Sequence, residues 1–189
     1  MLTKLKHLVN VSGISGRESA IAARISEYMT PLCDKVETDA IGSLIAARCY
    51  EKLKGLTPDK EKALAYAAGF DGEAWSAALR KFLGKSAESM IALEKKEGKY
   101  NVQKHAERLP VILDHWQEIL QVIDEELPSA ASLEALLDRL GAPKAPAEIG
   151  IDPSVLPMTF KASKDIRDKY VLPRLAWDLG VLDEIADAL

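Results

Sequence analysis

From residue 47 to the C-terminus, the sequence repeats one pattern: a helix-start signal, then apolar residues at helical spacing, then Gly or Pro. Thr57, Pro58 and Asp59 together are typical of a helix start, because Thr caps free N–H groups, Pro fits the first turn and Asp complements the helix dipole. The Asp-Gly-Glu sequence at residues 71–73 and Ser86 predict two more starts. A chain patterned in this way is expected to fold mainly as α-helices.

Residues 101–127 carry the longest apolar stripe, with apolar side chains at i, i+4 and i+7. Pro110 lies inside this stretch and is expected to divide it, since proline lacks the N–H that a helix interior needs. Gly141 predicts the end of the next helix. Further helix starts are predicted at Ser132, Pro157 and Pro173, and the helix from Pro157 is expected to reach Tyr170.

Residues 1–46 have a different pattern. Ser15 and Glu18 form a capping box, which predicts a short helix, and apolar residues nearer the N-terminus predict another. Residues 36–46 predict two short strands joined by a turn. The expected fold class is therefore mainly α: a compact, bundle-like multi-helix domain at residues 47–189 with a small N-terminal α/β appendage at residues 1–46, made of one or two short helices and a short β-hairpin.

Charge and cysteine content indicate which partners and which cellular compartment are expected for this protein. The net charge is −4, with Lys and Arg scattered among acidic residues, so a nucleic-acid partner, which requires a basic face, is not expected. No apolar run approaches the ~20 residues that span a bilayer, and the N-terminus does not resemble a signal peptide. Cys33 and Cys49 lack CxxC spacing and are interpreted as reduced, partly buried thiols. A soluble cytoplasmic protein without a membrane partner is expected.

Histidine is scarce, which bears on metal binding. The chain has 3 His, and only His105 and His115 stand near acidic residues. On one helix they would lie ~15 Å apart along the axis, too far to bind one ion. They are interpreted as solvated helix residues, and no metal ligand is assigned, because zinc and related ions need three or four converging ligands.

The other candidate groups are also interpreted as structural. No serine lies in a G-x-S-x-G motif, and neither a phosphate-binding nor a dinucleotide-binding glycine pattern is present. No catalytic or cofactor-binding residue is therefore assigned. The tryptophans are expected in the core and the acidic residues near one helix end in a solvated patch; these are Trp75, Trp116 and Trp177, and Asp124, Glu125 and Glu126.

Four short sequences in the C-terminal part follow one another in an order that resembles the end of a glycerol-1-phosphate dehydrogenase, a family grouped with the iron-containing alcohol dehydrogenases. They are AEIGIDP at residues 147–153, FKA at 160–162, IRDKY at 166–170 and WDLG at 177–180. The resemblance covers residues 43–189.

The resemblance implies a two-domain enzyme that reduces dihydroxyacetone phosphate with NADH or NADPH. In such enzymes an N-terminal α/β domain binds the dinucleotide, and a divalent metal on one Asp and two His polarises the substrate carbonyl. The glycine-rich cofactor segment and the metal ligands of that family are missing from this sequence. No cofactor is therefore expected in this chain, which is expected not to catalyse the reaction alone.

Residues 1–46 resemble the start of the dinuclear-metal aminopeptidases of the glutamyl-aminopeptidase type, through SGISGRE at 12–18 and VETDAIGSLIA at 36–46. That family's first metal ligand, in an H-x-D-x-x-G motif, has no counterpart, since no His occurs between His7 and His105. The two resemblances meet near residues 42–47. Three interpretations stand: a dehydrogenase-like helical module, a non-enzymatic helical interaction or oligomerisation module, in which a homo-oligomer is left open, and an aminopeptidase fragment.

Overall fold

The structure is a computed structural model that describes residues 41–166 and 169–189, and all regular secondary structure in these residues is helical. This confirms the mainly α fold class. The α-helices in chain order are α3 (Ile41–Lys54), α4 (Lys60–Ala68), α5 (Gly72–Leu83), α6 (Ala87–Glu97), α7 (Val102–Asp114), α8 (Trp116–Glu126), α9 (Ala130–Leu140), α10 (Leu156–Ser163), α11 (Leu172–Asp178) and α12 (Leu182–Ala186). Short 3₁₀ helices between them are η1 (Gly84–Ser86), η2 (Pro146–Ile149) and η3 (Pro153–Val155).

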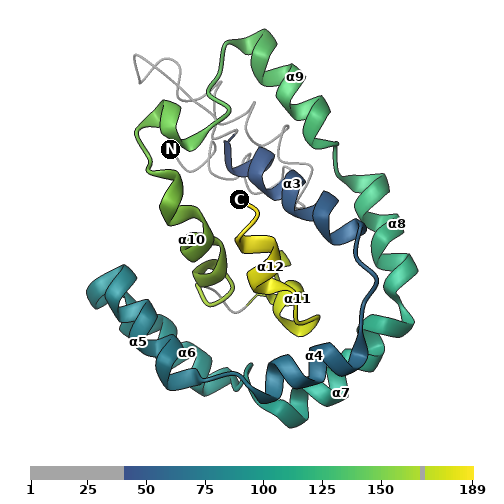
Figure 1. Cartoon of the computed structure of the whole chain (residues 1–189), viewed down its shortest axis with the longest axis vertical. Coiled ribbons are helices and arrows are strands. Elements are labelled where there is room, and N and C mark those ends of the chain that lie inside the picture. Colours follow the sequence, from purple (N-terminus) through teal and green to yellow (C-terminus); the bar gives the residue numbers. More distant parts are fainter. Residues whose placement is uncertain (1–40, 167–168) are drawn as a thin grey trace, which may run out of the picture.

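Helices α11 and α12 lie at the centre of the described part, and the other helices surround them (Figure 1). Every residue of α11 is buried, although Arg174 and Asp178 are charged. Helix α11 packs on α4, α10 and α12, and α12 also packs on α3. A helix enclosed in this way has no solvent-facing stripe. Its polar residues must therefore find their partners inside the protein.

The main apolar core surrounds Trp177 of α11, which is 0% exposed. The rings of Tyr66, Phe70 and Tyr100 meet it at steep angles, with centroids 6.2, 5.5 and 5.1 Å from the indole centroid. Edge-to-face pairs of this kind are favourable because ring edges are positive and ring faces negative. One indole therefore fixes α4, the α4–α5 turn and the α6–α7 turn relative to one another.

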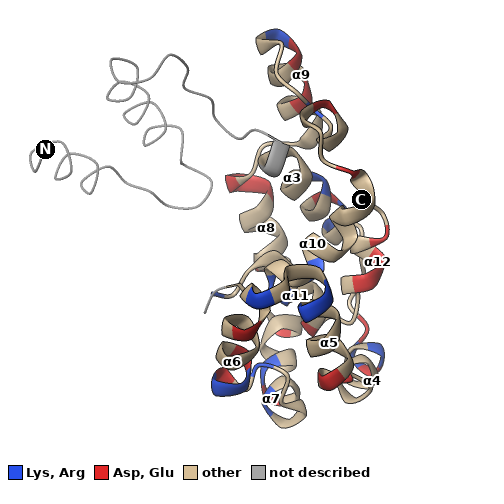
Figure 2. Cartoon of the chain, turned by 90° about the vertical axis from the view of Figure 1, so that its left-hand side faces the viewer, with Lys and Arg blue, Asp and Glu red and all other residues tan. Residues whose placement is uncertain are grey.

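Two smaller apolar clusters extend this core. Leu79 of α5 and Ile91 of α6 pack together with Ala162 of α10. Leu44 of α3 and Leu137 of α9 belong to the other. Helix α9 packs mainly on α3 and stands at one end of the described part (Figure 2), so this cluster is its chief attachment.

Several helix starts follow the local sequence signals. Asp71 caps α5 by accepting from two backbone N–H groups of the first turn, and α6 begins directly after Ser86. Helix α4 also begins at its predicted signal, but the cap is Asp59 rather than Thr57. The reason is geometric: the Asp59 carboxylate accepts from the backbone N–H of Lys62 at 3.0 Å.

Two other expected boundaries are wrong. Pro110 lies inside α7 and does not divide it, because Ile112, which follows it, is buried in the main core and keeps the helix on its course; the chain breaks at His115 instead. Ser129, and not Ser132, caps α9, since the Ser129 hydroxyl accepts from the Ser132 backbone N–H at 3.1 Å.

The helix expected to run from Pro157 to Tyr170 is also shorter than predicted. Helix α10 ends at Ser163. The next two residues, Lys164 and Asp165, are 1% and 0% exposed. The chain leaves the helix here because both charged side chains enter buried contacts with other helices.

Residues 41–46 were expected to complete a hairpin, but they form the first turns of α3. The helix brings Leu44 and Ala47, three residues apart, onto one face toward Leu137 of α9. Burial on α9 therefore outweighs the strand-like pattern. Helix α3 continues through the boundary expected between residues 46 and 47. The rest of the expected appendage, residues 1–40, lies outside the described residues.

Expectations about the membrane and the thiols can be checked in part. Within residues 41–166 and 169–189, no helix combines the length and apolar character needed to cross a bilayer. Cys49 is free and buried, and burial raises the pKa of its thiol to about 11. Cys49 is therefore protonated near neutral pH. Cys33 lies outside the described residues.

Candidate functional site

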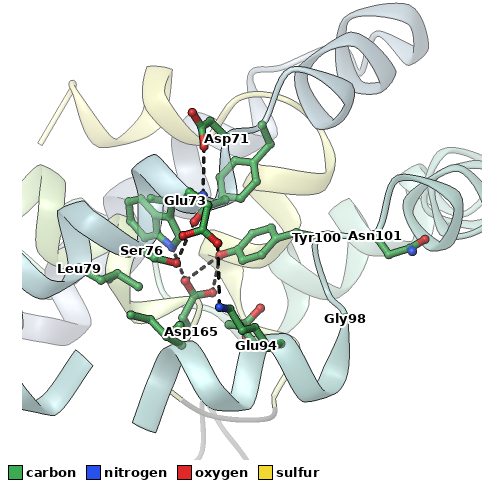
Figure 3. A pocket seen from close by; sticks show the side chains of 14 residues that line it. Asp71, Glu73, Ser76, Leu79, Glu94, Gly98, Tyr100, Asn101 and Asp165 are labelled. Carbon is green, nitrogen blue, oxygen red and sulfur yellow. Dashed lines mark hydrogen bonds and ion pairs between the residues drawn. The ribbon is translucent and has the colours of Figure 1, made fainter. Parts of the chain in front are cut away.

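A cavity of about 420 Å³ opens between α5, α6 and the start of α7. Figure 3 shows Glu73, Tyr100 and Asp165 facing this space from three different elements. Its wall combines aromatic rings, aliphatic side chains and charged groups. The aromatic members are Phe70, Trp75 and Tyr100, and the charged members are Asp71, Glu73, Glu94, Lys95 and Asp165.

Asp165 forms part of the cavity wall and is 0% exposed. Its carboxylate accepts from the Tyr100 hydroxyl at 2.6 and 2.7 Å and from the Trp75 indole N–H at 2.7 Å (Figure 3). The Arg174 guanidinium donates to it at 2.9 Å. A buried carboxylate is unfavourable unless its oxygens are hydrogen-bonded. These donors therefore hold α5, the α6–α7 turn and α11 around one acid.

Arg174 connects Asp165 to a second buried carboxylate, Glu94 of α6. Its Nη2 donates to Glu94 Oε2 at 3.1 Å, while Lys99 Nζ lies 3.2 Å from Glu94 Oε1. The guanidinium carbon lies 4.7 Å from the Tyr100 ring centroid, a cation–π contact. Its Nε and Nη1 have no hydrogen-bond partner in the described part of the chain. Together with Lys164, these charged residues form a group that we call the buried ionic cluster: Glu94, Lys99, Lys164, Asp165 and Arg174.

Lys164 is the cation of this cluster closest to an aromatic face. Its Nζ lies 3.5 Å from the Trp75 ring centroid and 3.4 Å from Asp165 Oδ2. It also donates to the backbone carbonyl of Lys161 at 3.0 Å. Burial lowers the pKa of Lys164 to about 8, against the opposing attraction of Asp165. The indole face and the carboxylate thus offset part of the cost of burying this ammonium group.

Burial raises the pKa of two other groups beside the cavity. It raises the pKa of Glu94, and the negative charge of Asp165 adds to this effect. It also raises the pKa of the Tyr100 hydroxyl, again with a contribution from Asp165. Both changes favour the neutral form. Tyr100 therefore remains a hydrogen-bond donor at any ordinary pH.

The rim of the cavity is more accessible. Asp71 caps α5 there, and Glu73 follows in the same turn with its side chain 85% exposed. Glu73 Oε1 lies 4.0 Å from Nζ of Lys95, which comes from α6 and is itself 66% exposed. Both residues line the cavity. This long ion pair therefore connects α5 and α6 at the rim of the cavity.

Asp178, at the end of α11, belongs to a second buried polar group outside the cavity lining. Arg108 donates to both of its oxygens, at 2.7 and 2.6 Å, and the Tyr170 hydroxyl donates at 2.7 Å. His105 Nε2 lies 2.8 Å from the Asp178 backbone carbonyl. Because a carbonyl only accepts, His105 is assigned the tautomer with a proton on Nε2. This group clamps α7 to α11.

A second hollow, of about 470 Å³, lies beside this group. Its wall is mostly apolar and comes from α3, α7, α8 and residues 170–175. The polar members His115 and Glu118 contact each other, with Nδ1 3.0 Å from Oε2. The apolar members include Ile112, Ile119, Ile123 and Leu175.

The histidine interpretation is wrong for one of the two residues. His105 is 0% exposed, because the carbonyl of Asp178 and the ring of Trp177 enclose it. His115 is exposed, as expected. The two histidines therefore face different partners, and the described residues do not assemble the one-Asp, two-His set that the dehydrogenase resemblance implies. In the same residues, no three His, Cys, Asp or Glu side chains converge as metal ligands would.

The interpretations of the tryptophans and of the acidic residues at the end of α8 are confirmed in most cases. Trp116 and Trp177 are 6% and 0% exposed, as expected for core residues. Trp75 is only partly buried and lines the cavity, so the core assignment is incomplete for it. The acidic patch at the end of α8 is exposed, and one of its members pairs with Lys54; its residues are Asp124, Glu125 and Glu126.

Sequence reasoning missed the buried ionic cluster. One signal was present: the charged residue Arg174 lies in the otherwise apolar segment of α11, four residues before Asp178 of the second buried polar group. On an isolated amphipathic helix such a pair indicates a solvated edge. Only the packing of other helices on that edge converts it into a buried one.

Comparisons with protein-family models, with curated proteins and with solved structures found no match to this chain. The resemblances stated above therefore remain predictions.

Proposed function

We propose that the described residues form a helical binding module, related to the helical domain of glycerol-1-phosphate dehydrogenases, that binds a small ligand in the cavity between α5, α6 and α7 and does not catalyse a reaction alone. The observation that carries this proposal is the buried ionic cluster beside the cavity. Buried ion pairs add little stability compared with apolar residues of similar size. Perturbed titratable groups next to a concave, aromatic-lined surface are instead typical of binding sites.

The position of the resembling sequences supports the relation to dehydrogenases. Residues 160–162 lie in α10 and residues 177–180 at the end of α11, where Trp177 is 0% exposed. Asp165 and Arg174, which lie between these sequences, belong to the buried ionic cluster. Asp165, which lines the cavity, therefore lies between two of the sequences that resemble the family.

Partners and compartment belong to this proposal as well. A small-molecule ligand, rather than nucleic acid or a membrane, is supported by the interspersed acidic and basic side chains of the described helices (Figure 2). A cytoplasmic location is supported by the free thiol of Cys49. A homo-oligomer is compatible with this function, and light scattering on the purified protein measures it directly.

The binding proposal is tested with a neutral probe of cavity size, 2-phenylethanol. The probe is titrated into the protein while backbone amide and indole NMR signals are recorded. The signals of the Trp75 indole N–H and of its neighbours on α5 and α6 are expected to shift. Glu73→Trp, which places a large ring at the rim, is expected to abolish these shifts. Glu61→Trp is the matched control, because Glu61 is the second residue of α4 as Glu73 is of α5. Shifts that do not cluster at the cavity contradict the proposal.

A second candidate is the reductase function that the resemblance implies, favoured by the same placement of residues 160–162 and 177–180. Its test is oxidation of NADH or NADPH with dihydroxyacetone phosphate, run beside elemental analysis of the purified chain. The binding proposal predicts no turnover from this chain. Turnover proportional to protein concentration, together with a stoichiometric divalent ion, would replace it.

A further inference from the structure

We infer that the cavity is specific for an organic cation: a small amine with an apolar or aromatic body, whose ammonium group takes the place of Lys95 beside Glu73. This inference rests on the proposed binding function and adds the chemical class of the ligand. Three observations lead to it: the cations that the aromatic rings already bind, the charges on the cavity wall, and the weakness of the ion pair at the rim.

The aromatic rings around the cavity already stabilise cations of the protein itself. Lys164 Nζ lies 3.5 Å from the Trp75 ring centroid, and the Arg174 guanidinium carbon lies 4.7 Å from that of Tyr100. A ring face carries negative quadrupole charge and attracts a desolvated cation. Trp75 therefore provides a ring suited to positive charge, whereas Tyr100 is already covered by Arg174 and by Phe70, whose ring stacks on it with centroids 4.2 Å apart.

The cavity wall itself is acidic. It carries four carboxylates and one ammonium group, that of Lys95. Glu94 and Asp165 are engaged by Arg174, and Asp71 accepts from the backbone at the start of α5. A ligand with a carboxylate or a phosphate would face Asp71 and Glu73, the two acids of the wall that Arg174, Lys164 and Lys99 do not offset. Electrostatic complementarity therefore selects against an anion.

Glu73 is the carboxylate at which a ligand ammonium can bind. Its contact with Lys95 Nζ is long, at 4.0 Å, and both side chains are mostly exposed. Ion pairs of this kind contribute little free energy, because water competes and two long side chains must be ordered. An amine whose body packs on Leu79, Ile91 and Phe70 gains apolar contacts that Lys95 does not make from the rim.

The test compares three probes of nearly equal size by calorimetric titration: 2-phenylethylamine, 2-phenylethanol and 3-phenylpropionate. The amine is expected to bind about tenfold more tightly than the alcohol, as one ion pair plus a cation–π contact allows. The carboxylate is expected to bind least. Equal affinities for amine and alcohol, or a preference for the carboxylate, would overturn the inference while leaving the binding function intact. Absence of binding by all three would overturn both.

Two variants identify the residues responsible. Glu73→Gln keeps the shape of the side chain and is expected to reduce the preference for the amine to about threefold, the part that a cation–π contact supplies, while Glu61→Gln, at the same position of α4, leaves it unchanged. Lys95→Met removes the competing ammonium and is expected to tighten amine binding about threefold, as expected for loss of one exposed ion pair. Lys85→Met, on the exposed turn after α5, is its control. An undiminished amine preference in Glu73→Gln places the cation elsewhere and overturns the assignment.

Discussion

Asp165 and Asp178 are both 0% exposed, and each accepts from a tyrosine hydroxyl and an arginine. Their counter-charges are supplied differently. Arg108 serves Asp178 through two short bonds and keeps its side chain 30% exposed, so it remains in contact with water. Arg174 is 2% exposed and reaches both Asp165 and Glu94 through a single nitrogen.

The two aspartates differ in how their buried charge is balanced. Around Asp178, one acid and one arginine form a bidentate pair, which joins two helices and depends on few other groups. Around Asp165, two acids share one arginine while Lys164 approaches from an aromatic face, so removing any member leaves the others uncompensated. The second arrangement is the one that borders the cavity.

The largest expected effect is that of Asp165→Asn. The substitution leaves Arg174 and Lys164 buried with less counter-charge, and breaking a buried ionic group in this way costs about 3–5 kcal/mol. The free energy of unfolding, measured by urea denaturation, is expected to fall by that amount. A loss below about 1 kcal/mol, the size typical of an exposed pair, would contradict the account of the cluster.

Asp178→Asn is expected to cost less, about 2–3 kcal/mol, although Asp178 is equally buried. Arg108 is partly exposed and can turn toward water once its partner is neutral, so the remaining cost is mainly that of lost charged hydrogen bonds. Denaturation under identical conditions ranks the two variants. A larger loss for Asp178→Asn would show that the groups around Asp178 depend more on its charge than those around Asp165 do.

The two tyrosines extend the same test to smaller effects. Tyr100→Phe is expected to lower the free energy of unfolding by about 2 kcal/mol, because Asp165 loses a charged hydrogen bond in a dry environment. Tyr170→Phe is expected to cost about 1 kcal/mol, since Tyr170 is 54% exposed and water can replace its hydroxyl. Equal losses in thermal or urea unfolding would show that the two sites do not differ in water access.

A pH dependence of the free energy of unfolding is also expected. The pKa of Lys164 is about 8 in the folded protein and about 10.5 in the unfolded chain, so the unfolded chain binds more protons between these values. Titration of Lys164 therefore increases the free energy of unfolding as pH rises, by at most about 1.4 kcal/mol per pH unit for one proton.

Cys49 acts in the opposite sense, because its pKa is raised to about 11 and the folded state retains its proton longer. The Lys164 contribution is therefore measured as the difference between wild type and Lys164→Met at pH 7.5, 8.5 and 9.5. This difference is expected to shift in favour of wild type with rising pH. Parallel curves would show that Lys164 titrates normally.

The helical class and several helix ends could be predicted from the amino-acid sequence. Asp71 and Gly141 mark such ends correctly, because a cap depends only on residues within the same turn. Apolar spacing also placed Trp116 and Trp177 in the core. It misplaced residues 41–46 and the break near Pro110, since both depend on which distant helix covers the segment.

The burial of His105 and the composition of the buried ionic cluster depend on how the helices pack together. Helix α11 has 7 residues, too few for periodicity to show which of its faces meets solvent. The partners of Arg174 include Glu94, 80 positions away in the chain. A charge is buried or solvated according to what packs around it, and that packing arises from contacts between helices that are remote in sequence.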